Sequence, residues 1–395
     1  MNKKIFTRTI WILSVVSLLT DISSEMLYPV MPLFLKSIGF SVMLIGVLEG
    51  FAEAVAGISK GYFGKLSDVT GRRVPFVRLG YSLSSVSKPM MAVFIYPVWI
   101  FFARTIDRFG KGIRTSARDA ILSDESTPEN KGKVFGLHRG MDTLGAVLGP
   151  FTALIYLNYY PENYKELFLI SFLPALIGVG FTFLLKDKSE AVKPSSEKLK
   201  FFSFLGYWKK SGAEYKKLVK GLFAFTLINS SDIFLLLMLK NLGYSDQKVL
   251  MVYIFYNLIY AISSLPIGIL ADKIGLKNNF IFGLVLFAFI YGSFAFNPGP
   301  EIIYFLFFCY ALYASSTEGI SKAWISNISE KKDTATALGF YTGINSIFSL
   351  LASSLAGLVW YSFGSDVMFI YSSAGALAVT VYFLNNFRKK NYSSI

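Results

Sequence analysis

The sequence predicts an all-α membrane protein whose twelve transmembrane helices form two pseudo-symmetric six-helix bundles. Three observations support this prediction. Of the 395 residues, 53% are hydrophobic and only 16% are charged, and the mean hydropathy is +0.50, which is typical of a chain that lies largely in lipid. Apolar runs long enough to cross a bilayer recur along the chain. Residues of the first half also recur in the second half at a nearly constant offset.

The apolar runs define the predicted spans. A helix needs about 20 residues to cross a hydrocarbon core about 30 Å thick. Twelve predominantly apolar runs fit this length, near residues 10–35, 42–63, 75–95, 97–118, 134–158, 166–185, 218–239, 248–270, 279–297, 301–323, 336–360 and 366–386. The fourth is the least apolar because it carries several charges. Basic residues precede the first, but no small-residue cleavage site follows it, so we interpret it as a span and not as a signal peptide.

The positions of the basic residues predict the orientation of the chain, because Lys and Arg collect on the cytoplasmic side. They concentrate at both ends and after the second, fourth, eighth and tenth spans, with Lys65, Arg118, Lys273 and Lys331 as examples. Both termini are therefore expected in the cytoplasm, and a prokaryotic plasma (inner) membrane is the expected location. We attribute the net charge of +14 to contact with membrane lipid and not with nucleic acid.

A long polar stretch divides the chain after the sixth span. We expect an N-terminal six-helix bundle at residues 1–186, a cytoplasmic linker at 187–217 and a C-terminal bundle at 218–395. The linker contains an amphipathic stretch, 201–208, which either lies on the lipid surface or is a plain solvated connection. We expect a monomer.

The two halves match at several separate places. Leu35, Lys36 and Gly39 recur as Leu239, Lys240 and Gly243, an offset of 239 − 35 = 204. The same offset relates Gly64, Leu66, Asp68 and Gly71 to Gly268, Leu270, Asp272 and Gly275. Gly136, Gly140 and Asp142 match Gly339, Gly343 and Asn345 at an offset of 203. This agreement indicates two equivalent halves that face each other across a central pathway.

The connection after the second span, residues 64–73, reads GKLSDVTGRR. It resembles the cytoplasmic signature G-x-x-x-D-R/K-x-G-R-R/K of the major facilitator superfamily (MFS), and residues 268–277 repeat it as GILADKIGLK. Val69 departs from the pattern. The resemblance implies a secondary transporter similar to drug and metabolite efflux proteins, with a gating loop. The residues it assigns to this loop are Gly64, Asp68, Gly71, Arg72, Arg73, Gly268, Asp272 and Gly275. The alternative is a tight basic loop without a switching role.

Two further segments are similar to family motifs. Gly145, Gly149 and Pro150 in the fifth span resemble the antiporter motif G-x-x-x-G-P, without its trailing glycine pair. This implies export by antiport, and close helix packing is the alternative. In the fourth span, Arg104 resembles the arginine of the family's R-x-x-x-G-x-G element, although Arg108 stands in place of its first glycine.

Ionised side chains within the spans are the candidate functional residues. A charge at mid-helix costs about 2.5–3.5 kcal/mol on insertion scales, so each should face water or a partner. A carboxylate beside cations can exchange a proton as water access changes. The proton-coupling candidates are Asp21, Glu25, Glu53, Asp142 and His138. The substrate-cavity candidates are Glu49, Arg104, Asp107, Arg108, Lys111, Arg139, Asp232, Asn257, Glu318 and Asn345. For the cations, structural ion pairing, binding of an anionic solute and proton relay all stay open.

Together these features predict a secondary active transporter that works by alternating access and exports a small polar or charged solute in exchange for protons. Proton-linked uptake and facilitated diffusion are the alternatives, and coupling to Na⁺ stays open. A channel, a sensor and a membrane enzyme are the rival classes. The single His and single Cys and the absence of nucleophile and nucleotide motifs disfavour an enzyme. We expect neither a cofactor nor a metal.

Overall fold

The computed structural model describes residues 5–28, 30–40, 42–161, 163–187 and 200–387, and every regular element in these ranges is helical. Twelve of the described helices are 16 residues or longer, and each coincides with a predicted span. They are α1 (Arg8–Leu27), α3 (Val42–Thr70), α4 (Val74–Val93), α5 (Pro97–Asp124), α6 (Lys131–Tyr159), α7 (Tyr164–Thr182), α9 (Ala213–Ile228), α11 (Asp246–Ile274), α12 (Leu276–Ala295), α13 (Pro300–Ile328), α14 (Thr334–Phe363) and α15 (Ser365–Asn386). The predicted fold class is confirmed.

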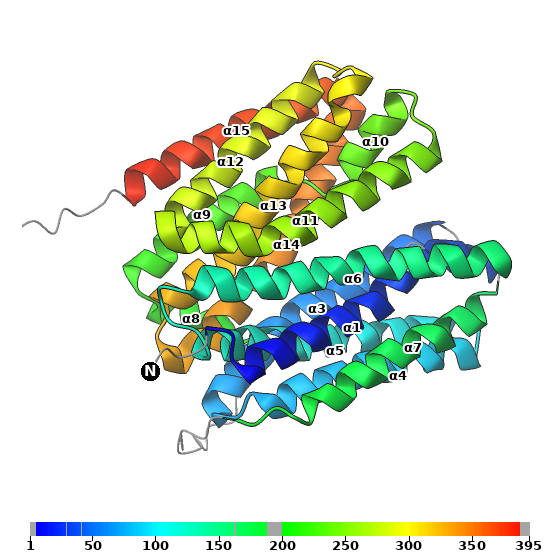
Figure 1. The fold of residues 1–395 in the computed structure, drawn as a ribbon, viewed down its shortest axis with the longest axis horizontal. Helices are drawn as coiled ribbons and strands as arrows, with labels where there is room; N and C mark the ends of the chain where they lie inside the picture. The colour runs from blue at the N-terminus through cyan, green and yellow to red at the C-terminus, as the bar shows by residue number, and fades with distance from the viewer. Residues whose placement is uncertain (1–4, 29, 41, 162, 188–199, 388–395) are drawn as a thin grey trace, which may run out of the picture.

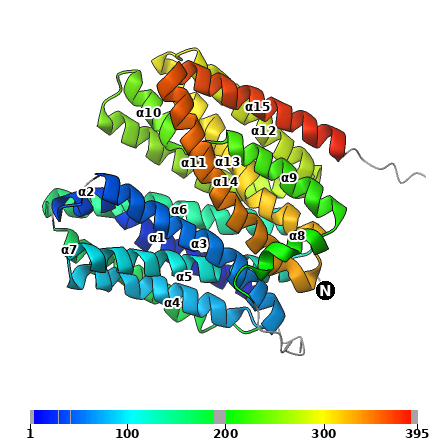
Figure 2. The ribbon, with the colours of Figure 1, turned by 180° about the vertical axis from the view of Figure 1, so that it is seen from behind.

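The long helices form two bundles (Figures 1 and 2). In the first, α1 packs against α6 and α7, and α4 packs against α5 and α7. In the second, α12 packs against α13 and α15, and α14 packs against α9. The two bundles meet where α3 crosses α14 and where α6 crosses α11. The exact boundaries 1–186, 187–217 and 218–395 stay a prediction.

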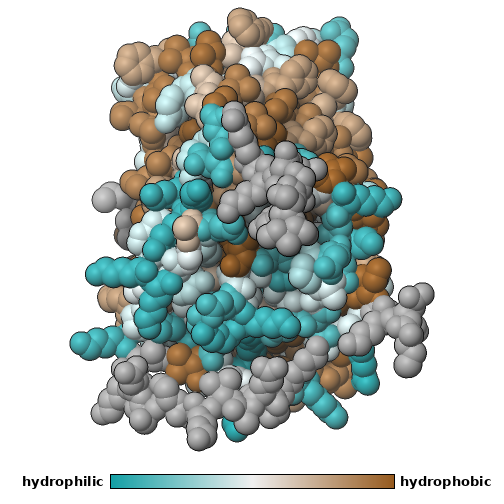
Figure 3. Space-filling model, turned by 90° about the vertical axis from the view of Figure 1, so that its left-hand side faces the viewer, coloured by the Kyte–Doolittle hydropathy of each residue, from teal (hydrophilic) through white to brown (hydrophobic). Residues whose placement is uncertain are grey.

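Apolar composition varies among the helices. Eight of the described helical segments are long and apolar enough to cross a membrane. Helix α5 is not among them, since it carries several charges, yet its residues from Gly112 to Ser123 are buried. Figure 3 shows one end of the molecule, with hydrophilic side chains over its middle and lower part and hydrophobic ones over its upper part. Figure 1 places the start of α1 and the end of α15 at this end. Because these residues of α5 are buried, its charged side chains lie among other helices.

Two predicted spans are interrupted, so the expectation of continuous helices over 10–35 and 218–239 is wrong in this detail. Helix α1 ends at Leu27 and a short helix, α2 (Met31–Ser37), follows it. Helix α9 ends at Ile228, and α10 (Ile233–Asn241) follows after a gap. The first stretch contains two prolines, which lack a backbone N–H. The second contains Asn, Ser and Asp, whose short side chains compete for backbone hydrogen bonds.

Two segments assigned to connections are helical instead. Arg118, which we expected after the fourth span, lies buried inside α5. The signature segments are also mostly helix, because α3 continues to Thr70 and α11 to Ile274. The description of a gating loop is therefore corrected: the turns begin only at Gly71 and Gly275, whose φ angles are 64° and 92°. Glycine tolerates this left-handed conformation, which terminates a helix.

The described end of the linker packs against both bundles. Phe204, in the short helix η1 (Ser203–Gly206), is buried, and its ring lies directly against Gly61 of α3. Trp208, in α8 (Tyr207–Lys210), stacks on Phe340 of α14 with ring centroids 5.8 Å apart. Lys65 donates a hydrogen bond to the Ser203 carbonyl oxygen at 2.9 Å. A plain solvated connection is therefore the wrong description of this segment.

Candidate functional site

One carboxylate of the signature segment connects the two bundles. Asp68, near the end of α3, accepts hydrogen bonds from the backbone N–H of Thr336 at 2.6 Å and of Ala335 at 3.3 Å. The Thr336 hydroxyl donates a third bond at 2.8 Å. Arg73 pairs with Asp68 at 3.1 Å and donates to the Lys331 carbonyl oxygen at 3.2 Å. Asp68 thus caps the N-terminus of α14, where free N–H groups and the helix dipole favour an anion.

The second copy of the signature makes the equivalent contact with the other pair of helices. Asp272, near the end of α11, accepts hydrogen bonds from the backbone N–H of Gly132 at 2.7 Å and of Lys133 at 2.9 Å. These N–H groups belong to the first turn of α6. The two signature aspartates therefore cap one helix each in the opposite bundle. Arg72 is exposed and takes no described part in this contact.

Glycines let the bundles approach closely at these crossings. A Cβ atom on Gly64 would lie 2.5 Å from the Ala335 carbonyl oxygen, and one on Gly339 would lie 2.5 Å from that of Lys60. At the other crossing, a Cβ on Gly136 would lie 2.5 Å from the Ser264 carbonyl oxygen. Gly268 likewise meets the backbone of Gly132. The glycines of the sequence repeat thus form the contact surface between the bundles.

A buried chain of polar side chains surrounds Asp142 on α6. The Ser17 hydroxyl of α1 donates to the Asp142 carboxylate and accepts a hydrogen bond from Arg118 at 3.1 Å. His138 Nε2 lies 3.8 Å from one Asp142 oxygen, and Arg139 Nη1 lies 3.9 Å from the other. Three helices of the first bundle therefore converge on one carboxylate.

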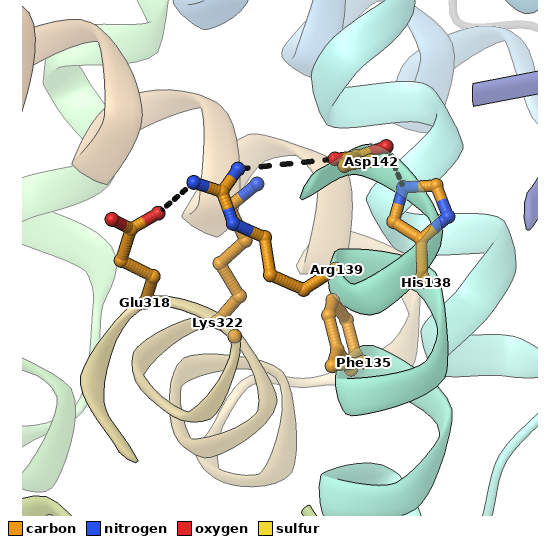
Figure 4. A pocket seen from close by; sticks show the side chains of 7 residues that line it. Phe135, His138, Arg139, Asp142, Glu318 and Lys322 are labelled. Atoms are coloured by element: carbon orange, nitrogen blue, oxygen red, sulfur yellow. Dashed lines mark ion pairs between the residues drawn. The ribbon is translucent and has the colours of Figure 1, made fainter. Parts of the chain in front are cut away.

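Two ion pairs continue this network into the second bundle. Both use α13: Glu318 pairs with Arg139 of α6, and Lys322 pairs with Asp119 of α5 at 2.8 Å. Asp119 is fully buried and also accepts two hydrogen bonds from Arg118. Figure 4 shows Arg139 between Glu318 and Asp142. These side chains share a small pocket lined by Phe135, His138, Arg139, Asp142, Glu318, Gly319 and Lys322.

Known proteins share this architecture. The family description "Major Facilitator Superfamily" matches residues 13–256 and 221–393 of the chain. An uncharacterized MFS-type transporter of Methanocaldococcus jannaschii is 33% identical over 382 residues, which cover 95% of this chain and 94% of that protein. The chain belongs to the Major Facilitator Superfamily. It is therefore an integral membrane protein of a transporter family, which is not an enzyme class.

Solved MFS structures resemble this MFS protein in fold. The human organic anion transporter MFSD10 superposes with a TM-score of 0.82 at 16% identity, covering 95% of this chain and 99% of that one. The proton:xylose symporter XylE superposes with a TM-score of 0.72 at 14% identity, covering 96% and 95%. At these identities the likeness extends to the fold alone.

Some charged candidates of this MFS protein pair within the first bundle, away from the pocket. Asp107 of α5 accepts a hydrogen bond from Lys88 of α4 at 2.8 Å, and Arg104 lies 3.3 Å from its second oxygen. All three side chains are buried. Glu53 of α3 pairs with Arg108 of α5 at 3.2 Å. This arrangement favours structural ion pairing for Arg104 and Asp107 among the alternatives left open by the sequence.

Lys111 lies among the remaining acidic candidates of the first bundle. It interacts electrostatically with Asp21, Glu25 and Glu53, and none of the described carboxylates comes within ion-pair distance of its ammonium group. The side chain of Glu49 lies outside the described residues. The predicted motif residues Gly145 and Gly149 pack α6 against α1, since a Cβ on Gly145 would lie 2.7 Å from that of Asp21.

Apart from Glu318, the candidates of the second bundle make hydrogen bonds and form no ion pair with another described residue. Asp232 accepts a hydrogen bond from the Tyr310 hydroxyl at 2.6 Å. Asn345 accepts one from the Thr226 hydroxyl at 2.6 Å, and the Asn257 amide donates to the Tyr253 carbonyl oxygen at 3.0 Å. The structure therefore groups His138, Arg139, Asp142 and Glu318 around one pocket, but not these residues.

Four residues of the charged network were not among the sequence candidates: Lys88, Arg118, Asp119 and Lys322. The predicted fourth span ended at residue 118, so Arg118 was assigned to a connection and Asp119 was not considered. The absence of Gly and Pro between Gly112 and Asp124 is a signal that could have extended this helix. Nothing in the sequence alone pairs Lys88 with Asp107.

Proposed function

We propose that this transporter moves a small polar or charged solute out of the cell in exchange for protons. The observation that carries the proposal is the pair of inter-bundle ion pairs, Asp119 with Lys322 and Glu318 with Arg139. In alternating access the bundles change their mutual contacts, so ion pairs between them separate and re-form. Asp119, in the pair with Lys322, is only 1% exposed, and a buried ion pair is costly to break unless a proton or a solute compensates the exposed charge.

The proposed coupling follows from the chemistry of a carboxylate. An unpaired carboxylate in a low-dielectric site takes up a proton more readily than a paired one. Asp142 is joined to both inter-bundle pairs, through Arg139 and through Ser17 with Arg118. We therefore assign proton uptake to the carboxylates of this network, with Asp142 and Asp119 as the first candidates. Asp21, Glu25, Glu53 and His138 stay candidates in the same proposal.

Polar solutes and proton coupling occur among proteins that share this fold, which agrees with the proposal. The similar solved structures include a proton:xylose symporter and an organic anion transporter. A citrate exporter of Aspergillus niger is 25% identical over 195 residues, which cover 48% of this chain and 36% of that protein. Export, a prokaryotic inner membrane, cytoplasmic termini and a monomeric state belong to the proposal. The charge distribution between spans and the glycine motif of α6 support the orientation and the direction.

Transport in proteoliposomes tests this proposal. A thermal-shift screen of metabolites first identifies a solute. Counterflow of the labelled solute then separates a carrier from a channel, because only a carrier exchanges. We expect a pH gradient to drive accumulation, and Asp142→Asn or Asp119→Asn to abolish this drive while solute counterflow persists.

Glu330→Gln is the matched control, because Glu330 is an exposed carboxylate that, among the described residues, pairs with Lys332 at the surface. If all acidic variants of the network, together with Asp21→Asn, Glu25→Gln and Glu53→Gln, keep full gradient-driven transport, the proton-coupling proposal is wrong. If the same gradient drives uptake of the solute instead of export, the proposed direction of transport is wrong.

A further inference from the structure

We infer that the interruption between α9 and α10 is a binding site for a monovalent metal cation, Na⁺, with Asp232 as its charged ligand. This site lies in the second bundle and uses none of the side chains of the proposed proton network as ligands. It therefore goes beyond the proposed function and does not depend on it.

The backbone of the interruption leaves oxygen atoms without partners. Residues 229–232 are not helical, although they lie in the middle of the seventh span. Within the described residues, the carbonyl oxygens of Leu227 and Ile228 accept no hydrogen bond, because the helix that would supply the donors has ended. An unsatisfied backbone group at bilayer depth costs several kcal/mol. Broken transmembrane helices commonly direct such carbonyl oxygens at a coordinated cation.

Side-chain oxygens at the interruption also lack hydrogen bonds of standard geometry. Ser230 is 3% exposed, and its hydroxyl has no hydrogen-bond partner among the described residues. The fully buried Tyr291 hydroxyl of α12 lies near the hydroxyls of Ser230 and Tyr310, but it makes no hydrogen bond of standard geometry with either. The Asn229 side-chain oxygen is a third such atom. Buried polar atoms are nearly always satisfied, so several oxygens that make no hydrogen bond of standard geometry around one interruption favour a bound ligand there.

Asp232 supplies the negative charge. Its carboxylate accepts a hydrogen bond from Tyr310, and no described Lys or Arg lies within ion-pair distance of it. The nearest strong charges in its electrostatic surroundings are Glu318 and Arg139, which pair with each other. Asp232 is exposed at the molecular surface, so a cation can reach it.

The set of ligands selects the class of cation. All the available atoms are oxygens of a carboxylate, an amide, hydroxyls and backbone carbonyls, and hard cations prefer such ligands. One carboxylate among neutral oxygens balances a single positive charge, whereas a divalent ion would leave an excess charge in a low-dielectric site. These two properties together favour Na⁺ over Ca²⁺ or a transition metal.

Direct binding of ²²Na⁺ to the purified full-length chain in lipid nanodiscs tests the inference, without any solute. We expect saturable binding that NaCl displaces and choline chloride at equal ionic strength does not. Asp232→Asn should weaken the apparent affinity about tenfold or more, because it removes the only charged ligand. Ser230→Ala and Tyr310→Phe should weaken it less.

Glu301→Gln is the matched control, since Glu301 is an exposed carboxylate in the first turn of α13 in the same bundle. Thermal unfolding in choline chloride checks that each variant folds, and Ser230→Ala carries the test if Asp232→Asn does not. The inference is overturned if the unmodified chain shows no saturable ²²Na⁺ binding, as expected when only water fills the site, or if Asp232→Asn binds normally. Displacement by methylammonium at lower concentration than by NaCl would instead assign the site to an ammonium group. None of these outcomes depends on proton-driven transport.

Discussion

The carboxylate of Asp272 accepts a backbone hydrogen bond from Gly132 at 2.7 Å across the boundary between the two bundles. Asp68, at 272 − 68 = 204 residues earlier, makes the matching contact with Thr336 at 2.6 Å. Each carboxylate lies at the start of a long helix of the opposite bundle. The duplicated sequence segment has therefore produced two copies of one inter-bundle contact, both at the same end of the molecule.

Removing the charge of Asp68 or Asp272 should separate the two bundles at the end of the molecule where these carboxylates lie. Asp68→Asn and Asp272→Asn each replace charge-assisted hydrogen bonds, which contribute about 1.5–3 kcal/mol, with neutral ones. We expect each variant to raise the open population about tenfold. Spin labels at Arg72→Cys and Lys332→Cys in a Cys309→Ser background measure it as a longer inter-bundle distance. Glu330→Gln is the control, and unchanged distances in both variants would contradict a gating role.

Replacing a glycine by alanine where helices of the two bundles cross should also separate the bundles. Gly136→Ala and Gly339→Ala would each place a Cβ 2.5 Å from a backbone carbonyl oxygen. We expect the crossing helices to separate and overpacking to lower the free energy of unfolding by about 1–3 kcal/mol. The same spin-label distances and a lower melting temperature measure these two effects. Gly180→Ala is the control, because nothing lies within 4 Å of its Cβ position. Equal behaviour of all three variants would refute close packing at the crossings.

The buried pair of Lys88 and Asp107 should stabilise the first bundle. Lys88→Met leaves a buried carboxylate with fewer partners, and breaking such a pair typically destabilises a protein by about 3–5 kcal/mol. Thermal unfolding in detergent measures this loss. Lys332→Met breaks an exposed pair, with side-chain exposures of 73% and 72%, and should change stability by less than about 1 kcal/mol. A Lys88→Met variant as stable as Lys332→Met would show that the pair is dispensable.

Trp208 should hold the short linker helices η1 and α8 in place against the second bundle. Trp208→Ala removes its stacking on Phe340, and an aromatic pair contributes about 0.5–1.5 kcal/mol beyond its buried area. We expect faster amide hydrogen exchange across residues 203–210. Leu205→Ala, at an exposed position in the same segment, should leave this exchange unchanged. If Trp208→Ala also leaves it unchanged, Trp208 does not hold the segment in place.

The sequence predicted the positions of the helices well and their continuity less well. Apolar run length together with the symmetry of the two halves identified all twelve long helices, because a bilayer imposes a minimum length on each. It could not detect the interruptions after Leu27 and Ile228, since hydropathy averages over a window that is longer than a short break. It also ended the fourth span before Asp119, because the polar residues that lie within this helix lower its hydropathy.

The candidate site was predicted in part. His138, Arg139, Asp142 and Glu318 were identified as charges within the spans, and the structure brings them to one pocket. Their pairing could not be predicted, because Glu318 and Arg139 lie far apart in the sequence and become neighbours only when the bundles meet. The pairing of Lys88 with Asp107 could not be predicted either, because α4 and α5 bring them together only in the fold.

The sequence by itself determined that the chain is a membrane protein of two related halves and which residues the halves share. Length, hydropathy and a repeat offset are properties along the chain, so they can be read without a fold. Only the tertiary structure decided that Asp68 and Asp272 cap opposite helices and that Lys322 meets Asp119. The physical reason is that a hydrogen bond or an ion pair requires contact within a few ångström, and helix packing alone sets which distant residues achieve it.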